Sequence, residues 1–82
     1  MSLDNNEYTL LDLKKGIRGR VKRIAGGTQA IKRLQALGII PGKEIVKISE
    51  MPLKGPVVVD VEHTQVALGC GLAKKVLVEV LN

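Results

Sequence analysis

The sequence predicts a mainly β domain, a small, strongly twisted and partly open barrel of about five strands that carries one α-helix after its first strand. Several short segments alternate apolar and polar residues, and only one segment has helical spacing. Nine glycines and three prolines break the chain between these segments. A chain of 82 residues has room for one domain, and a sheet that closes on itself hides its edge strands.

The predicted elements follow a polar N-terminal segment. Residues 1–9 are expected to be flexible, and residues 10–82 to form the single domain. In the first strand, residues 17–23, apolar or small residues alternate with arginine and lysine, so one face is solvent-exposed and positively charged. Within this strand, Gly19 indicates a bend or a close backbone approach. Further strands are predicted at residues 43–50, 57–62, 65–68 and 76–81, with a short helical turn at residues 72–75 before the last one.

Residues 29–37 form the predicted helix, with Thr28 as its N-cap. The apolar residues of this segment fall on one helical face, and its charged and amide side chains fall largely on the others. Gly38 stands where a left-handed glycine ends a helix, and Pro41 soon afterwards prevents continuation. Pro41 and Gly42 then form a tight turn, so all three residues are assigned to turn geometry.

Composition limits the class of protein. Tyr8 is the only aromatic residue, so the core must consist of valine, isoleucine, leucine and alanine. A single cysteine cannot form an internal disulfide, which fits a reducing compartment. The polar N-terminus lacks the basic and apolar regions of a leader peptide, and no apolar run approaches the roughly 20 residues that span a bilayer. We therefore expect a cytoplasmic protein without direct membrane insertion.

Residues for enzymatic catalysis are sparse. The chain has one histidine and one cysteine, far apart in sequence, and no arguable serine–histidine–aspartate set. Asp60 and Glu62 point the same way on a predicted strand, as an acid–base pair would, but we favour a solvated strand face. The stretch from Gly38 to Glu44 has the wrong glycine spacing for a phosphate-binding loop and lacks the hydroxyl residue that holds magnesium. The protein is not expected to be an enzyme.

His63 and Cys70 are the candidate metal ligands, with Asp60 and Glu62 nearby in sequence. A closed site normally takes three or four protein ligands, so this pair predicts at most a weak or intermolecular site for a transition metal, Fe2+ or Zn2+. No cofactor is expected to be required. His63 also has a structural explanation, because histidine tolerates the positive φ of a hairpin turn. A metal-responsive regulatory domain is one functional alternative.

Eight of the 13 lysines and arginines lie between Lys14 and Arg33, a stretch without acidic residues. Such a patch attracts phosphate or an acidic protein surface. Single-strand binders need stacking aromatics, and duplex readers usually present a basic recognition helix, whereas this helix offers only Lys32 and Arg33. Nucleic-acid binding is therefore a further alternative, but no nucleic-acid partner is expected. The patch indicates a protein-docking face or solvated charge.

The order of turns and apolar positions from Leu10 to Val80 resembles the ferrous iron transport protein A (FeoA) family. The most specific part is residues 32–42, Lys-Arg-Leu-Gln-Ala-Leu-Gly-Ile-Ile-Pro-Gly, which is similar to the family pattern Arg-Leu…Leu-Gly-(Leu/Ile)-x-Pro-Gly. Supporting segments are residues 10–16, 51–56, 66–68 and 76–78, together with Ala73. Two positions depart from the family: His63 stands where glycine is frequent, and Gly69 where arginine is frequent.

This resemblance implies an SH3-like barrel and a cytoplasmic accessory role in ferrous iron uptake. Members of the family are thought to act on the ferrous iron transporter B (FeoB), a membrane protein with a cytoplasmic GTP-binding domain. Similar domains lie at the C-terminus of iron-dependent transcriptional repressors. In neither setting is the domain known as an enzyme.

Our leading hypothesis is a rigid barrel that presents a docking surface to that transporter domain. Lys32 and Arg33 are expected to supply charge. Ile39 and Ile40 are expected as partly exposed apolar contacts, with core packing as the alternative. Leu53 is a second expected contact, because two flanking prolines stiffen its loop and a rigid loop loses less entropy on docking. Exposed strand edges in so small a barrel also favour a homo-oligomer.

Overall fold

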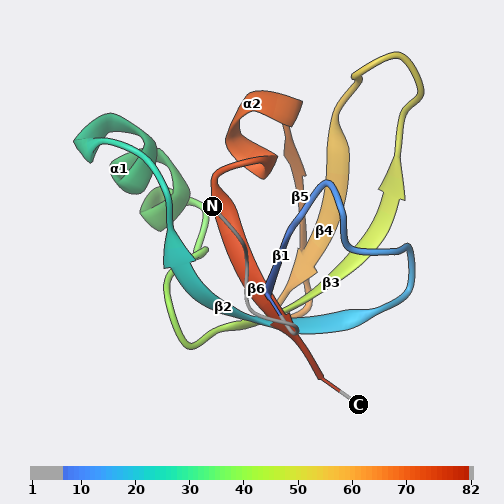
Figure 1. The fold of residues 1–82 in the computed structure, drawn as a ribbon, viewed down its shortest axis with the longest axis horizontal. Helices are drawn as coiled ribbons and strands as arrows, with labels where there is room; N and C mark the ends of the chain where they lie inside the picture. The colour runs from blue at the N-terminus through green and yellow to red at the C-terminus, as the bar shows by residue number, and fades with distance from the viewer. Residues whose placement is uncertain (1–6, 82) are drawn as a thin grey trace.

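The computed structural model describes residues 7–81 as a single curved antiparallel sheet with two helices (Figure 1). The strands are β1 (Glu7–Thr9), β2 (Arg18–Ile24), β3 (Glu44–Glu50), β4 (Val57–Val61), β5 (Thr64–Leu68) and β6 (Val76–Val80), and the helices are α1 (Thr28–Ala36) and α2 (Cys70–Ala73). The strand order across the sheet is β1-β6-β2-β3-β4-β5. The mainly β prediction is confirmed, including the helix after the first predicted strand and the short one before the last, but Thr28 is the first residue of α1 and Gly27, not Thr28, is its N-cap.

Strand β1 is the element that the sequence did not predict. It lies in the segment that was expected to be flexible, and it pairs with β6 from Glu7↔Glu79 to Thr9↔Leu77. The Glu7 side chain is buried and pairs with Arg23 at 3.3 Å. A three-residue strand has too little alternation to be recognised in the sequence, so the sheet has six strands where about five were expected. Residues 1–6 of the same expected segment lie outside the described residues.

The core is aliphatic, as the composition required. Strand β4 alternates in the expected way, with Val57, Val59 and Val61 buried and the residues between them partly exposed. Helix α1 contributes Ala30 and Leu34 from its apolar face. The buried cluster joins residues from every strand except β1 with both helices and the segment after β1: Leu10, Leu13, Val21, Leu34, Ile39, Ile45, Val57, Val59, Val61, Leu68, Ala73, Val76 and Val78.

Helix α1 ends where the sequence predicted, at a left-handed glycine. Gly38 has a φ of 83°, and its N–H donates to the Gln35 carbonyl at 3.0 Å. The Ile39 N–H donates to the Leu34 carbonyl at 2.9 Å, which completes a Schellman motif. In that motif the residue after the glycine packs against the last turn of the helix, and Ile39 is 0% exposed. The expectation that Ile39 is a partly exposed docking contact is therefore wrong.

The turn after α1 has the geometry that its proline and glycine demand. The Lys43 N–H donates to the Ile40 carbonyl at 3.2 Å, so Pro41 and Gly42 are the central residues of the turn. Gly42 has a φ of 96°, which suits the third position of a type II turn. The Gly42 N–H also donates to the Val21 carbonyl at 2.8 Å, which fastens the turn to β2.

The surroundings of strand β2 account for both Gly19 and the basic face that the sequence predicted. A Cβ at Gly19 would lie 3.1 Å from the Glu79 carbonyl oxygen, so the predicted close backbone approach is confirmed. Arg18 and Arg20 point to solvent and form ion pairs with Glu44 at 4.0 and 3.9 Å, and Arg20 also reaches Glu79 at 3.8 Å. These exposed pairs contribute little stability, but they neutralise part of the basic stripe.

Candidate docking surface

The most unusual surface feature is the tip of the β3–β4 hairpin. The Gly55 N–H donates to the Pro52 carbonyl at 3.2 Å, which closes a four-residue turn with Leu53 and Lys54 at its centre. Both central residues are left-handed, with φ of 59° and 61°, as a type I′ turn requires. Such turns normally use asparagine and glycine, because glycine has no Cβ and the short polar side chain of asparagine tolerates the left-handed conformation, whereas most other side chains are strained there. Leu53 nevertheless occupies the first central position and is 98% exposed.

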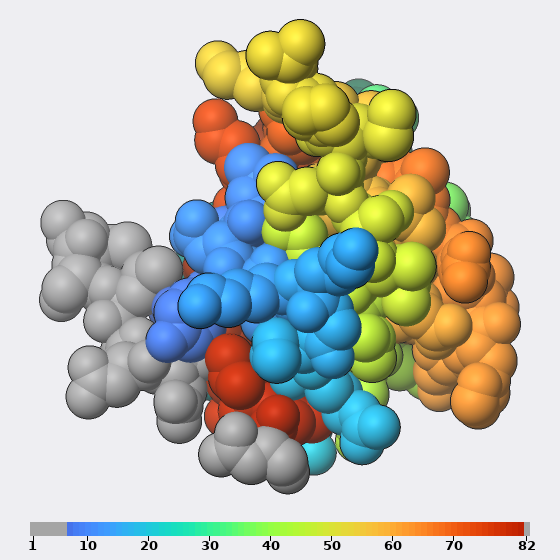
Figure 2. Space-filling view, turned by 90° about the vertical axis from the view of Figure 1, so that its right-hand side faces the viewer, coloured from blue at the N-terminus to red at the C-terminus, as the bar shows by residue number. Residues whose placement is uncertain are grey.

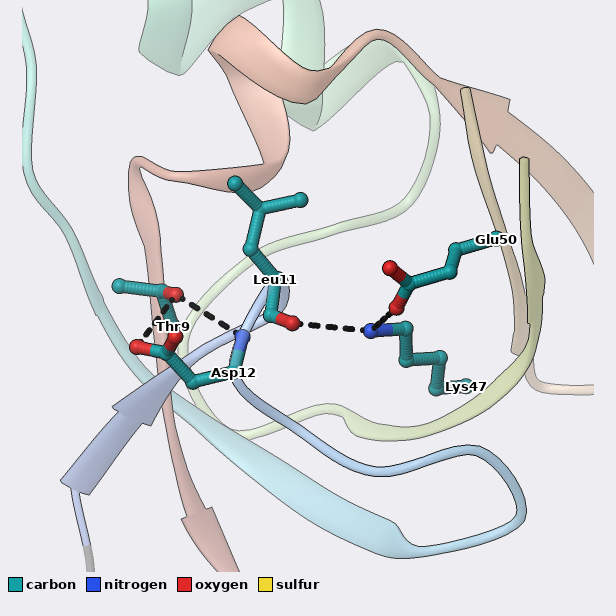
Figure 3. Close-up of polar contacts among 5 residues, drawn as sticks. All are labelled: Thr9, Leu11, Asp12, Lys47 and Glu50. Atoms are coloured by element: carbon teal, nitrogen blue, oxygen red, sulfur yellow. Dashed lines mark hydrogen bonds and ion pairs between the residues drawn. The ribbon is translucent and has the colours of Figure 1, made fainter. Parts of the chain in front are cut away.

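The hairpin is held to the barrel at its base by a buried lysine. Lys47 on β3 is 1% exposed, and its Nζ donates to the Leu11 carbonyl oxygen at 3.0 Å (Figure 3). The same ammonium forms an ion pair with Glu50, which is half exposed. At the hairpin neck, the Met51 N–H donates to the Pro56 carbonyl at 3.0 Å. The bond to Leu11 ties β3 to the segment that follows β1, and the other two contacts hold the hairpin itself together.

That segment is itself held in place by local side-chain bonds. The Thr9 hydroxyl donates to Asp12 Oδ2 at 3.1 Å and accepts from the Asp12 N–H at 3.2 Å (Figure 3). The resulting turn carries Leu11, whose carbonyl receives the Lys47 ammonium. The sequence analysis missed this role of Lys47, although a period of two from the buried Ile45 places the lysine on the inward face.

A hollow of about 420 Å³ lies beside the hairpin. Its lining comes from the loop, from α2 and from the segment after β1: Leu11, Glu50, Met51, Pro52, Leu53, Lys54, Gly55, Val57, Cys70 and Lys74. Met51 is 57% exposed and adds a second accessible apolar side chain beside Leu53. In the space-filling view the loop projects from the top of the molecule (yellow in Figure 2). We call these lining residues the hairpin site.

The charges of the hairpin site are mainly positive. Lys54 and Lys74 are exposed, and the one acid of the lining, Glu50, is paired with buried Lys47. Lys32 and Arg33 are exposed on α1, as predicted. Figure 1 places α1 at the upper left of the view, the β3–β4 loop at the upper right and α2 between them, so the cations of α1 lie on the opposite side of the view from the loop.

The two candidate metal ligands are not brought together. His63 lies in the β4–β5 turn with a φ of 71°, which confirms its predicted conformation, and Cys70 opens α2 at the other end of β5. At about 3.3 Å per residue this five-residue strand is roughly 17 Å long, whereas a metal lies only about 2 Å from each ligand. One chain therefore cannot hold an ion between them, and residues 7–81 contain no group of three or more His, Cys, Asp or Glu residues suited to a metal.

The acidic pair on β4 and its turn has structural partners. Asp60 Oδ1 accepts a hydrogen bond from the His63 N–H at 3.0 Å, and Glu62 pairs with Lys43 at 3.0 Å. Both lie around a second hollow of about 510 Å³, where Arg18 and Lys43 face Glu44, Asp60 and Glu62. Positive and negative side chains are mixed there, so this hollow has no uniform charge that would attract a ligand of the opposite sign.

Comparisons with known proteins agree with this architecture. The FeoA domain pattern matches residues 8–80. A protein of Methanocaldococcus jannaschii assigned as Fe(2+) transport protein A is 36% identical over 72 residues, which are 88% of this chain and 85% of the relative. The crystal structure of an iron uptake regulatory protein (FeoA) has a TM-score of 0.84 at 33% identity, covering 92% of this chain and 97% of the other. A manganese-dependent transcriptional repressor shares the fold, with a TM-score of 0.85 at 21% identity, covering 98% of this chain and 45% of the repressor.

Neither helix within residues 7–81 has the length and apolar character of a membrane span. The sequence match extends over nearly all of these residues, and it includes the Schellman motif and the proline–glycine turn after α1. The chain therefore belongs to the FeoA family and has its SH3-like fold.

Proposed function

We propose that this protein is a cytoplasmic accessory of ferrous iron uptake that docks, through the hairpin site, on the GTP-binding domain of the membrane iron transporter FeoB. Membership of the FeoA family supports the link to ferrous iron transport. The observation that carries the docking role is Leu53, a large apolar residue that is 98% exposed on a strained turn. The role is contact with a partner rather than conversion of a substrate, and it requires no cofactor.

Strain and exposure together point to a partner. A left-handed conformation costs a residue with a Cβ about 1–2 kcal/mol, and the turn contains two such residues in succession. Leu53 recovers none of this by packing in the single chain, since its side chain has almost no contact with the barrel. Strained residues that the fold does not need are concentrated at binding and switch sites. Burial of Leu53 in a pocket of the partner would contribute about 1.5–3 kcal/mol.

The construction of the loop also suits docking. The Lys47 contacts and the Met51–Pro56 hydrogen bond fix the hairpin before any partner arrives, so little conformational entropy is lost on association. The exposed cations nearby would guide an acidic partner surface and increase the association rate. We therefore expect the matching site on the transporter domain to be an apolar pocket with a carboxylate rim.

The metal-responsive and nucleic-acid alternatives gain no support from the geometry. His63 and Cys70 are a strand length apart, so metal binding by this pair would need ligands from a second chain. The basic stripe of β2 is partly neutralised by Glu44 and Glu79, and the chain has a single aromatic residue, Tyr8, for stacking on bases.

The test is a binding titration between this protein and the soluble GTP-binding domain of the transporter. Leu53→Asn removes the apolar side chain but keeps a residue that tolerates the left-handed conformation, and we expect at least tenfold weaker binding. Glu62→Asn is the matched control, because Glu62 is exposed on the other left-handed turn, with a φ of 50°. Unchanged affinity of the Leu53→Asn protein would contradict docking through the hairpin.

A further inference from the structure

Strand β5 is an unprotected sheet edge. It pairs with β4 alone, and Thr64, Gln65 and Ala67 are exposed. Edge strands are usually protected from further pairing by a charged residue, a proline or a β-bulge. The β5 sequence Thr-Gln-Val-Ala-Leu has no charge, proline or glycine, and its register with β4 is uninterrupted. The opposite edge, β1, has only three residues.

The β4–β5 turn determines which backbone groups of β5 are free. Glu62 and His63 are the two central residues of the turn, so the flanking pair Val61 and Thr64 exchanges hydrogen bonds. Since hydrogen-bonded and non-hydrogen-bonded pairs alternate along antiparallel strands, Thr64, Val66 and Leu68 direct their N–H and C=O groups toward β4. Those of Gln65 and Ala67 point outward, and no other strand within residues 7–81 pairs with them.

We propose that two copies of this protein associate through β5, as an antiparallel pair of strands related by a twofold axis at Val66. In this register Gln65 of one copy lies opposite Ala67 of the second copy, and the two copies together form four N–H···O=C bonds. These four bonds use all the outward backbone groups of both strands. Val66 lies opposite Val66 of the second copy in a non-hydrogen-bonded pair, where side chains are closest.

A second copy fits this edge better than a different partner. The uncharged strand gives an unrelated protein no electrostatic feature to recognise, whereas the self-paired register leaves no outward donor or acceptor unmatched. It also sets no like charges opposite one another within residues 64–68. None of residues 64–68 lines the hairpin site, so the pairing does not require docking on the transporter. A contact of five residues a side is small, and the association is accordingly concentration-dependent.

Cysteine crosslinking tests the register. The single native cysteine is first removed by Cys70→Ser, and Val66→Cys is added to that protein. Opposite residues of a non-hydrogen-bonded pair have Cα atoms about 4.5 Å apart, within disulfide range, so mild oxidation should give a covalent dimer. Gln65→Cys in the same background is the control, because the two copies of residue 65 are offset by two positions and lie beyond about 7 Å. Equal crosslinking of the two proteins, or none at position 66, overturns the proposal.

Amide hydrogen exchange of the wild-type protein gives an independent measurement. Raising the concentration from tens of micromolar to about one millimolar should slow exchange at Gln65 and Ala67 severalfold, while Thr64 and Val66, bonded to β4, stay unchanged. Ala67→Pro removes one outward donor and should abolish the effect, whereas Ala67→Ser, which keeps the N–H, should preserve it. Exchange at Gln65 and Ala67 that does not depend on protein concentration, or that slows only when the transporter domain is added, refutes pairing between copies.

Discussion

Replacing the two strained residues of the β3–β4 turn should stabilise the protein and weaken docking at the same time. The double variant Leu53→Asn/Lys54→Gly introduces the residue pair that type I′ turns favour. Because Leu53 is 98% exposed, the loss of its side chain removes almost no buried apolar area. The stability change is therefore governed by the backbone.

The expected magnitude follows from two opposing terms. Relief of two left-handed residues is worth about 1–2 kcal/mol each, although asparagine relieves only part of the strain. The new glycine makes the unfolded chain more flexible, which offsets about 0.5–1 kcal/mol. The net gain is about 1–2 kcal/mol in the free energy of unfolding. For a domain of this size, 1 kcal/mol corresponds to roughly 4–8 °C in Tm.

Urea denaturation and thermal melting measure the stability, and a titration with the soluble GTP-binding domain of the transporter measures the docking. We expect a higher Tm together with at least tenfold weaker binding, which is a loss of about 1.4 kcal/mol or more. A variant that melts below the wild type would show that the left-handed turn is not strained. A variant that binds as tightly as the wild type would show that the exposed leucine is not a contact.

The remaining predictions concern other parts of the fold. Lys47→Ala should lower the free energy of unfolding by about 2–4 kcal/mol. Lys47→Met should lower it by only about 1–2 kcal/mol, because the methionine side chain refills the space that the lysine occupied. Equal losses for the two variants in urea denaturation would contradict the packing role of Lys47. Gly38→Ala should cost about 1–2 kcal/mol from its φ of 83° alone, since a Cβ there meets nothing within 4 Å. Gly19→Ala should cost more in the same assay, because its Cβ would press on the Glu79 carbonyl. In a zinc titration of dilute protein, His63→Ala and Cys70→Ser should each leave the binding curve unchanged. If either variant loses a stoichiometric zinc site that the wild type has, the conclusion that His63 and Cys70 lie too far apart to share an ion is wrong.

Local chemistry made the end of α1 and the following turn predictable. Gly38 and Gly42 have positive φ because the Schellman motif and the type II turn need residues without a Cβ, and both signals involve only neighbouring residues. The alternation of Val57, Val59 and Val61 likewise depends on the period of a strand rather than on its partners. Such features can be inferred from a few residues of sequence.

Features that depend on distant partners could not be inferred in this way. Ile39 was expected as a partly exposed contact, with core packing as the alternative, and its place after the left-handed glycine of the Schellman motif buries it. Lys47 is buried because a carbonyl from the segment after β1 lies beside its ammonium, and nothing near it in sequence indicates that acceptor. The exposure of Leu53 agrees with the predicted docking contact, but its left-handed conformation was not expected, because Leu-Lys is not a typical type I′ sequence.

The two left-handed turns of this chain differ in what compensates their strain. At the β4–β5 turn, Glu62 pairs with Lys43 and the His63 N–H is bonded to Asp60, so the fold itself offsets the unfavourable backbone. At the β3–β4 turn, the side chains of Leu53 and Lys54 form no hydrogen bond or ion pair with any other residue between positions 7 and 81. The fold would lose nothing if an asparagine–glycine pair stood in their place. The proposed docking role gives this leucine a physical reason, because a bound partner is the component that would bury it.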